Sequence, residues 1–350
     1  MAQPAFEVEG FLPELNATTQ RTIVPEVSDN VMMSDPLLAM LRANRLESYP
    51  GGQSIQQDFL YAAEGGGAFS PGDTFPITRK QTITGGNWQP KQYFVPVTEW
   101  LEQINIYNRG PQAAISIIQS KMQSAALTMS ARLAIDTYQA GQGARILHLN
   151  GLAEICNDGT NATFDGGTYT TYGTVPRNGT IGSALNSPMT GPTANVNGPL
   201  SYKAMDEAYW SVVVGTEHPN VMITTNLGLS YINQKFQPEQ RFMSQDARIG
   251  FVGLQFNQGR IYPSQYAPGT KTVPDGTNLG YNVTAGGETL FFLNDSTFKL
   301  YVSDDPLFGF GFTGFKVAQD NLTVAGQYLF AGNITNIQPR FSRVLFNITA

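Results

Sequence analysis

The stretch GGQSIQQDFLYAAEGGGAFSPGDTFPITRKQTITGGNWQPKQYFVPVTEW, residues 51–100, decides the fold of this chain. Glycines at 65–67 and 85–86 and the pair Pro71-Gly72 divide it into extended strands. The segment is too extended and too rich in glycine to fold back over a core of its own. We therefore expect it to need an external surface.

A single long helix is predicted directly after this arm, over residues 111–140. Pro111 suits the first helical turn, where a backbone N–H would have no partner, and Gly141 and Gly143 end the helix. At 1.5 Å per residue the helix would span roughly 45 Å. One apolar stripe comprises Ile115, Ile118, Met122, Ala126, Met129 and Leu133. The opposite, polar face comprises Gln112, Ser116, Gln119, Gln123 and Thr128. An arm that needs a partner, attached to a rigid rod, favours a building block over a catalyst.

The composition describes a large chain with few charges. Its 350 residues are 41% hydrophobic, enough for a core shared by two or three subdomains, but only 14% are charged. Asn, Thr, Gln and Gly fill the polar positions. Such a surface repels copies of itself weakly, which suits a protein that packs against many neighbours. It equally suits a protein with little need of charge for solubility.

Charge and cysteine content exclude several classes of function. A net charge of −6 and a pI of about 5.0 argue against tight, phosphate-driven binding of nucleic acid. The single cysteine, Cys156, excludes an intrachain disulfide and a multi-thiolate metal site, and is expected to be a buried thiol. Residues 1–15 lack the basic region of a secretory signal, and no apolar run is long enough to cross a bilayer. We expect the chain to fold in a cytoplasm.

The rest of the chain alternates between helix and strand signals, which indicates an α+β fold. Ser34-Asp35-Pro36 is a helix-start signal within an N-terminal arm, and residues 150–200 have the composition of ordered turns and short strands. Helices are predicted at 201–214 and 227–236, the second capped by Asn226. Strands are predicted at 220–225, 259–262, 289–293 and 297–302, and within the alternating segment 312–348.

No constellation of residues supports catalysis, a cofactor or a metal. His148 and His218 lie far apart and are expected to be structural or solvated. The GxGxxG at 309–314 lacks the preceding strand and following helix of a dinucleotide site and is predicted to be a turn between strands. Asp158 and Asp165 flank a glycine-rich turn without the closing Glu of a calcium loop. Asn-x-Ser/Thr triplets occur at Asn16, Asn161, Asn178, Asn282, Asn294, Asn321, Asn333 and Asn347, and follow from the composition. We predict no catalytic, cofactor-binding or metal-binding residue and no cofactor.

The order of segments resembles the major capsid protein of tailed bacteriophages, the Hong Kong 97-type fold. The resemblance covers about residues 35–350 and depends on order and spacing together. It is carried by GGGAFSPGDTFPITRKQ, KQYFVPVTEW, the long helix, NGLAEICNDGTN, YGTVPRNGTIGSALNS, NVMITTNLGLSYINQKFQPEQRF, VGLQFNQGRIYPSQYAPG and LFFLNDSTFKLYV.

This resemblance implies a division into an N-terminal arm, an extended E-loop hairpin, a peripheral (P) domain and an axial (A) domain. The arm would be 1–50 and the E-loop, which lies across a neighbouring subunit, 51–100. The P domain would be 101–149 and 297–330, with the spine helix at 111–140, and the A domain 150–296 and 331–350.

The function implied is self-assembly into hexamers and pentamers of an icosahedral shell around packaged double-stranded DNA. The chain would assemble in the host cytoplasm and reside in the virion. A separate scaffolding protein and a portal are expected partners, decoration or cement proteins possible ones, and a membrane none. Lys80 and Lys91 lie in or near the E-loop, but no Asn or Glu partner is marked, so covalent cross-linking is not expected.

Two other kinds of protein remain as alternatives. One is a different phage structural protein, from a tail or baseplate, or a surface binding module, although the long helix speaks against an all-β adhesin. The other is a hydrolase with a polar surface, against which the missing triad and metal ligands speak.

Overall fold

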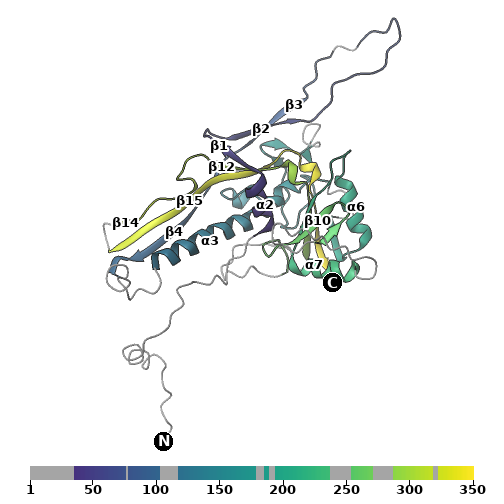
Figure 1. Cartoon of the computed structure of the whole chain (residues 1–350). Coiled ribbons are helices and arrows are strands. Elements are labelled where there is room, and N and C mark those ends of the chain that lie inside the picture. The colour runs from purple at the N-terminus through teal and green to yellow at the C-terminus, as the bar shows by residue number, and fades with distance from the viewer. Residues whose placement is uncertain are drawn as a thin grey trace.

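The computed structural model describes most of the chain from residue 35 onward. The described residues are 35–75, 78–102, 117–178, 185–188, 194–236, 254–270, 287–317 and 322–350. Within them, two six-stranded sheets contribute to one shared apolar core, and a long arm and a hairpin extend from the body (Figure 1).

The first sheet is organised around one long strand, β15. Its members are β1 (Leu46–Tyr49), β4 (Lys91–Trp100), β12 (Phe298–Ser303), β13 (Gly309–Phe312), β14 (Lys316–Val317) and β15 (Thr323–Asn336). The whole length of β4 pairs antiparallel with one edge of β15, over residues 323–332 of β15. The strands β12, β13 and β14 pair with its other edge. β1 extends the sheet in parallel with β12. The outer half of β15 and β4 together form the two-stranded arm in Figure 1, and from here on "the arm" means this pair of strands and not the N-terminal arm of residues 1–50.

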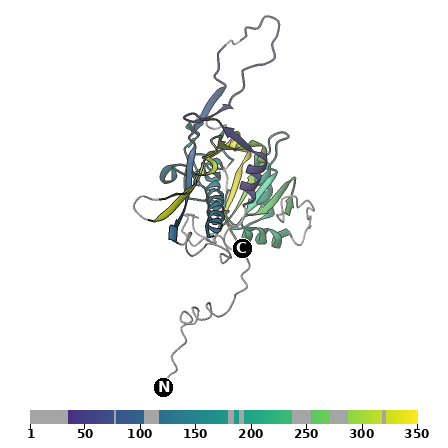
Figure 2. The same cartoon turned by 60° about the vertical axis from the view of Figure 1, so that its left-hand side comes forward.

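The predicted long helix is present as α3 (Ile117–Thr137), which lies along one face of the arm (Figures 1 and 2). Its 21 residues span roughly 31 Å. The predicted start at Pro111, with Gln112, Ile115 and Ser116, lies outside the described residues. The helix ends three residues before the predicted Ala140. The N–H groups of Tyr138 and Gln139 bond three residues back instead of four, which tightens the last turn.

The prediction of an apolar stripe on α3 is correct in part. Met129 and Leu133 are buried as predicted, but Ala126 is exposed and Ala125 is buried in its place. On the predicted polar face Gln123 is exposed, while Thr128 is half-buried. A single stripe describes only the first part of the helix, because from Ala131 to the end every residue except Arg132 is buried.

The second sheet has the order β7-β16-β11-β8-β10-β9. Its strands are β7 (Asn195–Pro199), β8 (Val221–Thr224), β9 (Leu254–Phe256), β10 (Gly259–Pro263), β11 (Glu288–Leu293) and β16 (Arg343–Thr349). All six residues of β11 are buried, because the strand is covered on both faces. Phe291 faces the main core beside Tyr138, whereas Phe292 belongs to a smaller cluster under two helices.

Those two helices, α6 (Tyr202–Val212) and α7 (Asn226–Phe236), match the predicted ones and cover one face of the sheet (Figure 1). The predicted cap of α7 is displaced by one residue. Asn226 is its first helical residue, and the cap is Thr225, whose hydroxyl oxygen accepts from the N–H of Gly228 at 2.9 Å. Thr225 also donates to the buried Glu288, and this contact favours Thr225 over Asn226 as the cap.

Shorter elements join the sheets. They are α2 (Pro36–Asn44), the hairpin β2 (Ile55–Leu60) with β3 (Ile83–Trp88), η3 (Gly143–Arg145), α4 (Leu152–Ile155), β5 (Thr171–Tyr172) with β6 (Val175–Pro176), η5 (Asp295–Thr297) and η6 (Pro339–Phe341). The predicted helix start at Ser34-Asp35-Pro36 is confirmed by α2, whose cap is Asp35.

Two sequence-based interpretations need correction. The GxGxxG segment is mostly the strand β13, bulged between Gly309 and Gly311, and its last glycine, Gly314 with φ +77°, lies in the short connection between β13 and β14. Residues 51–100 do not all lack a core of their own. β4 is integrated into the first sheet, with Val95 and Val97 buried against α3, because its alternating pattern finds a partner in β15.

Candidate assembly interface

The hairpin formed by β2 and β3 projects from the body of the molecule (Figures 1 and 2). Its strands pair from Ile55↔Trp88 to Leu60↔Ile83, and the N–H of Tyr61 continues the ladder to the carbonyl of Thr82. Beyond that point the two sides of the hairpin lead to a turn at Pro71-Gly72. The N–H of Ser70 donates to the Asp73 carboxylate at 2.7 Å and fixes this turn.

An aromatic cluster anchors the base of the hairpin. The rings of Phe59, Trp88 and Tyr172 lie 5.2 to 6.4 Å apart, and all three side chains are buried. Gly173 allows this packing, because a Cβ there would lie 2.3 Å from the Trp88 ring. The Tyr172 hydroxyl donates to the carbonyl of Asn336 at the end of β15. The base is thereby fixed to both β5 and the first sheet.

The outer part of the hairpin, in contrast, exposes large apolar side chains. Leu60 is 76% exposed, Phe69 67%, Phe75 61% and Ile83 57%. Phe69 and Phe75 pack only edge to face on each other, with ring centroids 5.0 Å apart. Apolar groups presented on a fixed base are typical of a surface that a partner covers.

The arm offers a second exposed surface. On the face of β4 away from α3, Phe94 is 64% and Trp100 62% exposed. On the face towards α3, Glu99 forms an ion pair with Lys121, whose ammonium also donates to the carbonyl of Thr98. The helix is thus fixed to one face of the arm, and the side chains on the other face of β4 are exposed among the residues that the structure describes.

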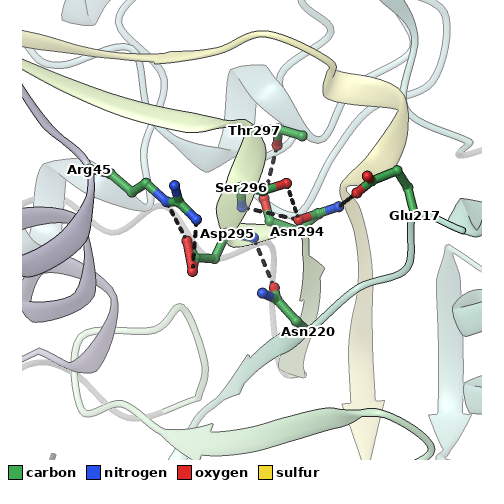
Figure 3. A network of polar contacts seen from close by, with 7 residues as sticks. All are labelled: Arg45, Glu217, Asn220, Asn294, Asp295, Ser296 and Thr297. Atoms are coloured by element: carbon green, nitrogen blue, oxygen red, sulfur yellow. Dashed lines mark hydrogen bonds and ion pairs between the residues drawn. The ribbon is translucent and has the colours of Figure 1, made fainter.

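A polar network fixes the junction between the two sheets (Figure 3). The helix η5 connects β11 of one sheet with β12 of the other. Asn294 caps η5 by accepting from the N–H of Ser296 at 3.0 Å, and its amide donates to Glu217 at 2.9 Å. Asp295 pairs with Arg45 at 2.8 Å, and its N–H donates to Asn220. The network ties η5 to the segment before β8 and to the end of α2.

His148 has a structural partner. Its Nδ1 lies 2.8 Å from a carboxylate oxygen of Asp136, and Tyr93 donates to the same oxygen at 2.6 Å. The hydrogen bond to Asp136 raises the pKa of His148 above its usual range. The sequence spacing of Tyr93, Asp136 and His148 does not reveal this cluster, because the three residues come from β4, α3 and the loop after α3.

The other sequence candidates have structural roles. Asp158 accepts from the N–H groups of Thr160 and Asn161, and Asp165 accepts from the N–H of Gly167, as in ordinary turns. His218 lies in the irregular segment between the turn at 215–216 and β8. No group of three or more His, Cys, Asp or Glu side chains gathers as a metal site within the described residues. Nor does any described helix have the length and hydropathy needed to cross a membrane.

The remaining candidates are Cys156 and the two lysines. Cys156 is fully buried as expected, and burial raises the pKa of its thiol. Lys91 is buried and donates to the carbonyl of Ile146 at 2.5 Å, so its ammonium is already bonded within the subunit. Lys80 is exposed on the hairpin.

Comparison with known proteins shows similarity of fold without similarity of sequence. No protein-family model matches the chain, and no curated protein matches it significantly. Among solved structures, the cyanophage A-1(L) capsid has a TM-score of 0.66 and 12% identity, over 96% of this chain and 99% of that one. The capsid of a native GTA particle has a TM-score of 0.61 and 10% identity, over the whole of both chains. The holo-SrpI encapsulin complex from Synechococcus elongatus PCC 7942 has a TM-score of 0.60 and 8% identity, over 96% of this chain and 95% of that one.

The fold class is therefore established: the chain is α+β and has the Hong Kong 97-type fold. This is the fold of capsid and encapsulin shell subunits, and the likeness extends over nearly the full length of both chains.

Proposed function

We propose that this chain is the major capsid protein of a tailed bacteriophage. Many copies assemble into hexamers and pentamers of an icosahedral shell that encloses packaged double-stranded DNA. The observation that carries the proposal is the full-length match to shell subunits, two of them capsids. The role is structural and requires no catalytic site or cofactor.

The projecting hairpin is the element that we assign to contacts between subunits. Its base is held by Trp88 and Tyr172, so it is presented rigidly, while Leu60, Phe69 and Phe75 gain a favourable apolar contact only against another surface. We assign residues 51–100 to the E-loop, with β4 as the strand that joins it to the P domain. The P domain then comprises 101–149 and 297–330, the A domain 150–296 and 331–350, and residues 1–50 the N-terminal arm.

The charge of the chain suits an enclosing role. A net charge of −6 with 21 Lys and Arg residues gives little general attraction for phosphate, so DNA inside the shell would not adhere to the wall. A scaffolding protein and a portal would act with the chain during assembly, in the host cytoplasm, and the virion would be its final location. Many modest contacts per subunit would stabilise the shell, since one very tight contact would trap assembly errors.

An encapsulin-type shell is the second candidate. The observation in its favour is the match to the encapsulin complex, with a TM-score of 0.60 over 96% of this chain. A tail or baseplate protein and a surface binding module remain weaker alternatives, because the capsid and encapsulin matches do not support them.

Expression of the full chain, alone and with a candidate scaffolding protein, tests the proposal by negative-stain electron microscopy. Closed particles are expected, and isolated monomers or tubes under both conditions would contradict it. The DNA protected from nuclease separates the two kinds of shell. In particles formed in cells that supply the packaging machinery, protected DNA supports a phage capsid, and empty particles favour an encapsulin-type shell.

A hairpin deletion tests the proposed contact. Residues 62–81 can be replaced by Asn-Gly, which closes a two-residue turn between Tyr61 and Thr82 and leaves the Trp88 anchor intact. The subunit should remain folded but form no shells. Replacing Gly65, Gly66 and Gly67 by serine, which keeps the length, is the matched control and should leave assembly unchanged.

A further inference from the structure

A cavity of about 240 Å³ opens between the strand β4 and the last turns of α3. Its wall includes Tyr93, Phe94, Arg132, Asp136, Leu147 and His148. Pockets for drug-sized molecules usually measure roughly 300–1,000 Å³. A cavity just below that range has room for a small molecule.

The buried side of the cavity is polar and already satisfied. The side chain of Asp136 is only 8% exposed, and it accepts from the Tyr93 hydroxyl at 2.6 Å and lies 2.8 Å from Nδ1 of His148. The Tyr93 oxygen in turn accepts from the N–H of Leu149 at 2.8 Å. These bonds connect β4, α3 and the following loop. The ring of His148 is therefore held in position before any ligand arrives.

Two donor groups in the wall remain available. Because Nδ1 of His148 is turned to Asp136, Nε2 lies on the side of the ring away from that carboxylate, and it has no hydrogen-bond partner among the described residues. Arg132 is the one exposed residue of the last turns of α3, and it forms no hydrogen bond or ion pair with a described residue. In a protonated histidine both ring nitrogens donate, and a guanidinium only donates. The two groups therefore need acceptors from outside the subunit.

The charge of the wall favours an anion. Asp136 is the one acidic residue in the described lining, against Arg132 and His148. The hydrogen bond to Asp136 raises the pKa of His148, whereas burial and the nearby charges of Arg145 and Arg132 act in the opposite direction. With His148 protonated, the lining carries one positive charge more than it has negative charges to balance. A bound anion would offset this excess and the repulsion between His148 and the arginines.

The remaining wall is apolar and decides which kind of anion fits. Phe94 of β4 is 64% exposed and Leu147 is 77% exposed, and both line the cavity. Inorganic phosphate would leave these side chains in water. A carboxylate carried on an apolar body would cover them and gain the corresponding hydrophobic free energy.

We infer that the cavity between β4 and α3 binds a small carboxylate with an apolar body. Its oxygens bond to Nε2 of His148 and to the guanidinium of Arg132, and its apolar part lies against Phe94 and Leu147. The charge-assisted hydrogen bonds orient the ligand, and the covered apolar surface adds affinity. The site lies within one subunit, so it does not depend on the proposed shell function, and its failure would leave that function untouched.

Benzoate is a suitable probe, because the chain has only two histidines to report on it. The Cε1 signals of His148 and His218 can be followed by NMR in the unassembled full chain, and His148→Gln identifies the first. At about pH 6, benzoate should shift the His148 signal with a dissociation constant of about 1 mM and leave the His218 signal in place. Because the anion stabilises the charged ring, saturating benzoate should raise the pKa of His148, and its affinity should fall as pH rises through that pKa.

Matched probes and variants separate the contributions. Benzyl alcohol lacks the charge and phosphate lacks the apolar body, so each should bind at least about tenfold more weakly than benzoate. Arg132→Gln should weaken benzoate at least about tenfold without unfolding the subunit, because the side chain is exposed. Lys203→Gln on α6 removes an equally positive, exposed side chain far from the cavity lining and should bind benzoate like the unaltered chain.

Each contrary outcome overturns a stated part of the site. If benzoate leaves the His148 signal unmoved, the cavity does not bind a carboxylate. Equal binding of benzyl alcohol would show that the charged groups take no part, and phosphate binding as tightly as benzoate would show that the apolar wall takes none. Unchanged affinity for benzoate in Arg132→Gln would remove Arg132 from the site and with it the proposed recognition.

Discussion

The hydroxyl of Tyr138 donates a 2.8 Å hydrogen bond to the carboxylate of Asp35, across 103 residues of sequence. The same carboxylate caps α2 through the N–H of Leu38 and accepts from Ser264 just after β10. One buried acid therefore links the N-terminal helix, the end of α3 and the second sheet. Burial raises its pKa above the usual value despite these three donors.

We expect Asp35→Ala to destabilise the subunit by about 3 kcal/mol, because it removes a helix cap and leaves two buried hydroxyl groups without their acceptor. Tyr138→Phe removes only one donor and should cost about 1 kcal/mol. Urea unfolding of the unassembled subunit measures both. If Asp35→Ala costs no more than Tyr138→Phe, the acid is not the common acceptor that its geometry indicates.

Gly173, which contacts Trp88, should be among the positions of the hairpin base that tolerate substitution least. Gly173 has φ +53°, and a Cβ there would lie 2.3 Å from the indole ring. Gly173→Ala should cost about 1 kcal/mol for the left-handed backbone and about 2 kcal/mol more for the clash. Trp88 is the only buried residue of the three tryptophans, so its fluorescence reports any displacement of the hairpin base.

Gly215→Ala is the control for this change. Gly215 has a similar φ of +64°, but a Cβ there would meet nothing within 4 Å. It should therefore cost only the backbone term, about 1 kcal/mol. Equal losses of unfolding free energy at the two glycines would show that the indole yields without cost.

Much of this architecture could be predicted from the sequence. The buried strands β8 and β11 and the helices α6 and α7 were located by their apolar patterns, and the strands of the hairpin by the glycine and proline breaks between them. The cap of α7 shows the limit of local signals. Thr225 and Asn226 are both good capping residues, and a long-range bond to Glu288 favours the first.

The candidate interface was harder to predict from the sequence. The alternation of β4 is visible in the sequence, but its partner β15 lies more than two hundred residues away, and no spacing rule connects them. Tyr93, Asp136 and His148 meet only because β4 packs on α3. A side-chain cluster formed by three elements carries no motif of its own.

The pair of His148 and Asp136 should make stability depend on pH in one direction. The pKa of His148 is raised in the folded state, so its contribution is fully present below the unfolded value of about 6.5 and is lost as pH rises through the folded pKa. The unfolding free energy of the native chain should exceed that of His148→Gln at pH 6 and converge towards it at high pH. Urea titrations of both proteins across this range measure the difference, and a difference that grows with pH would contradict the assignment.

The junction helix η5 allows a buried cap and an ion pair to be compared at adjacent residues. The Asp295 carboxylate pairs with Arg45, but both side chains are partly exposed, at 24% and 34%, so Asp295→Asn should cost less than about 1 kcal/mol. Asn294 is 3% exposed, caps η5 and donates to Glu217. Asn294→Ala removes these bonds from a buried site and should cost about 2 kcal/mol. Added salt should diminish the effect of Asp295→Asn and leave that of Asn294→Ala, because only the first depends on screened charge. If both losses fall with salt, the junction is held mainly by ionic attraction, and the neutral cap contributes little.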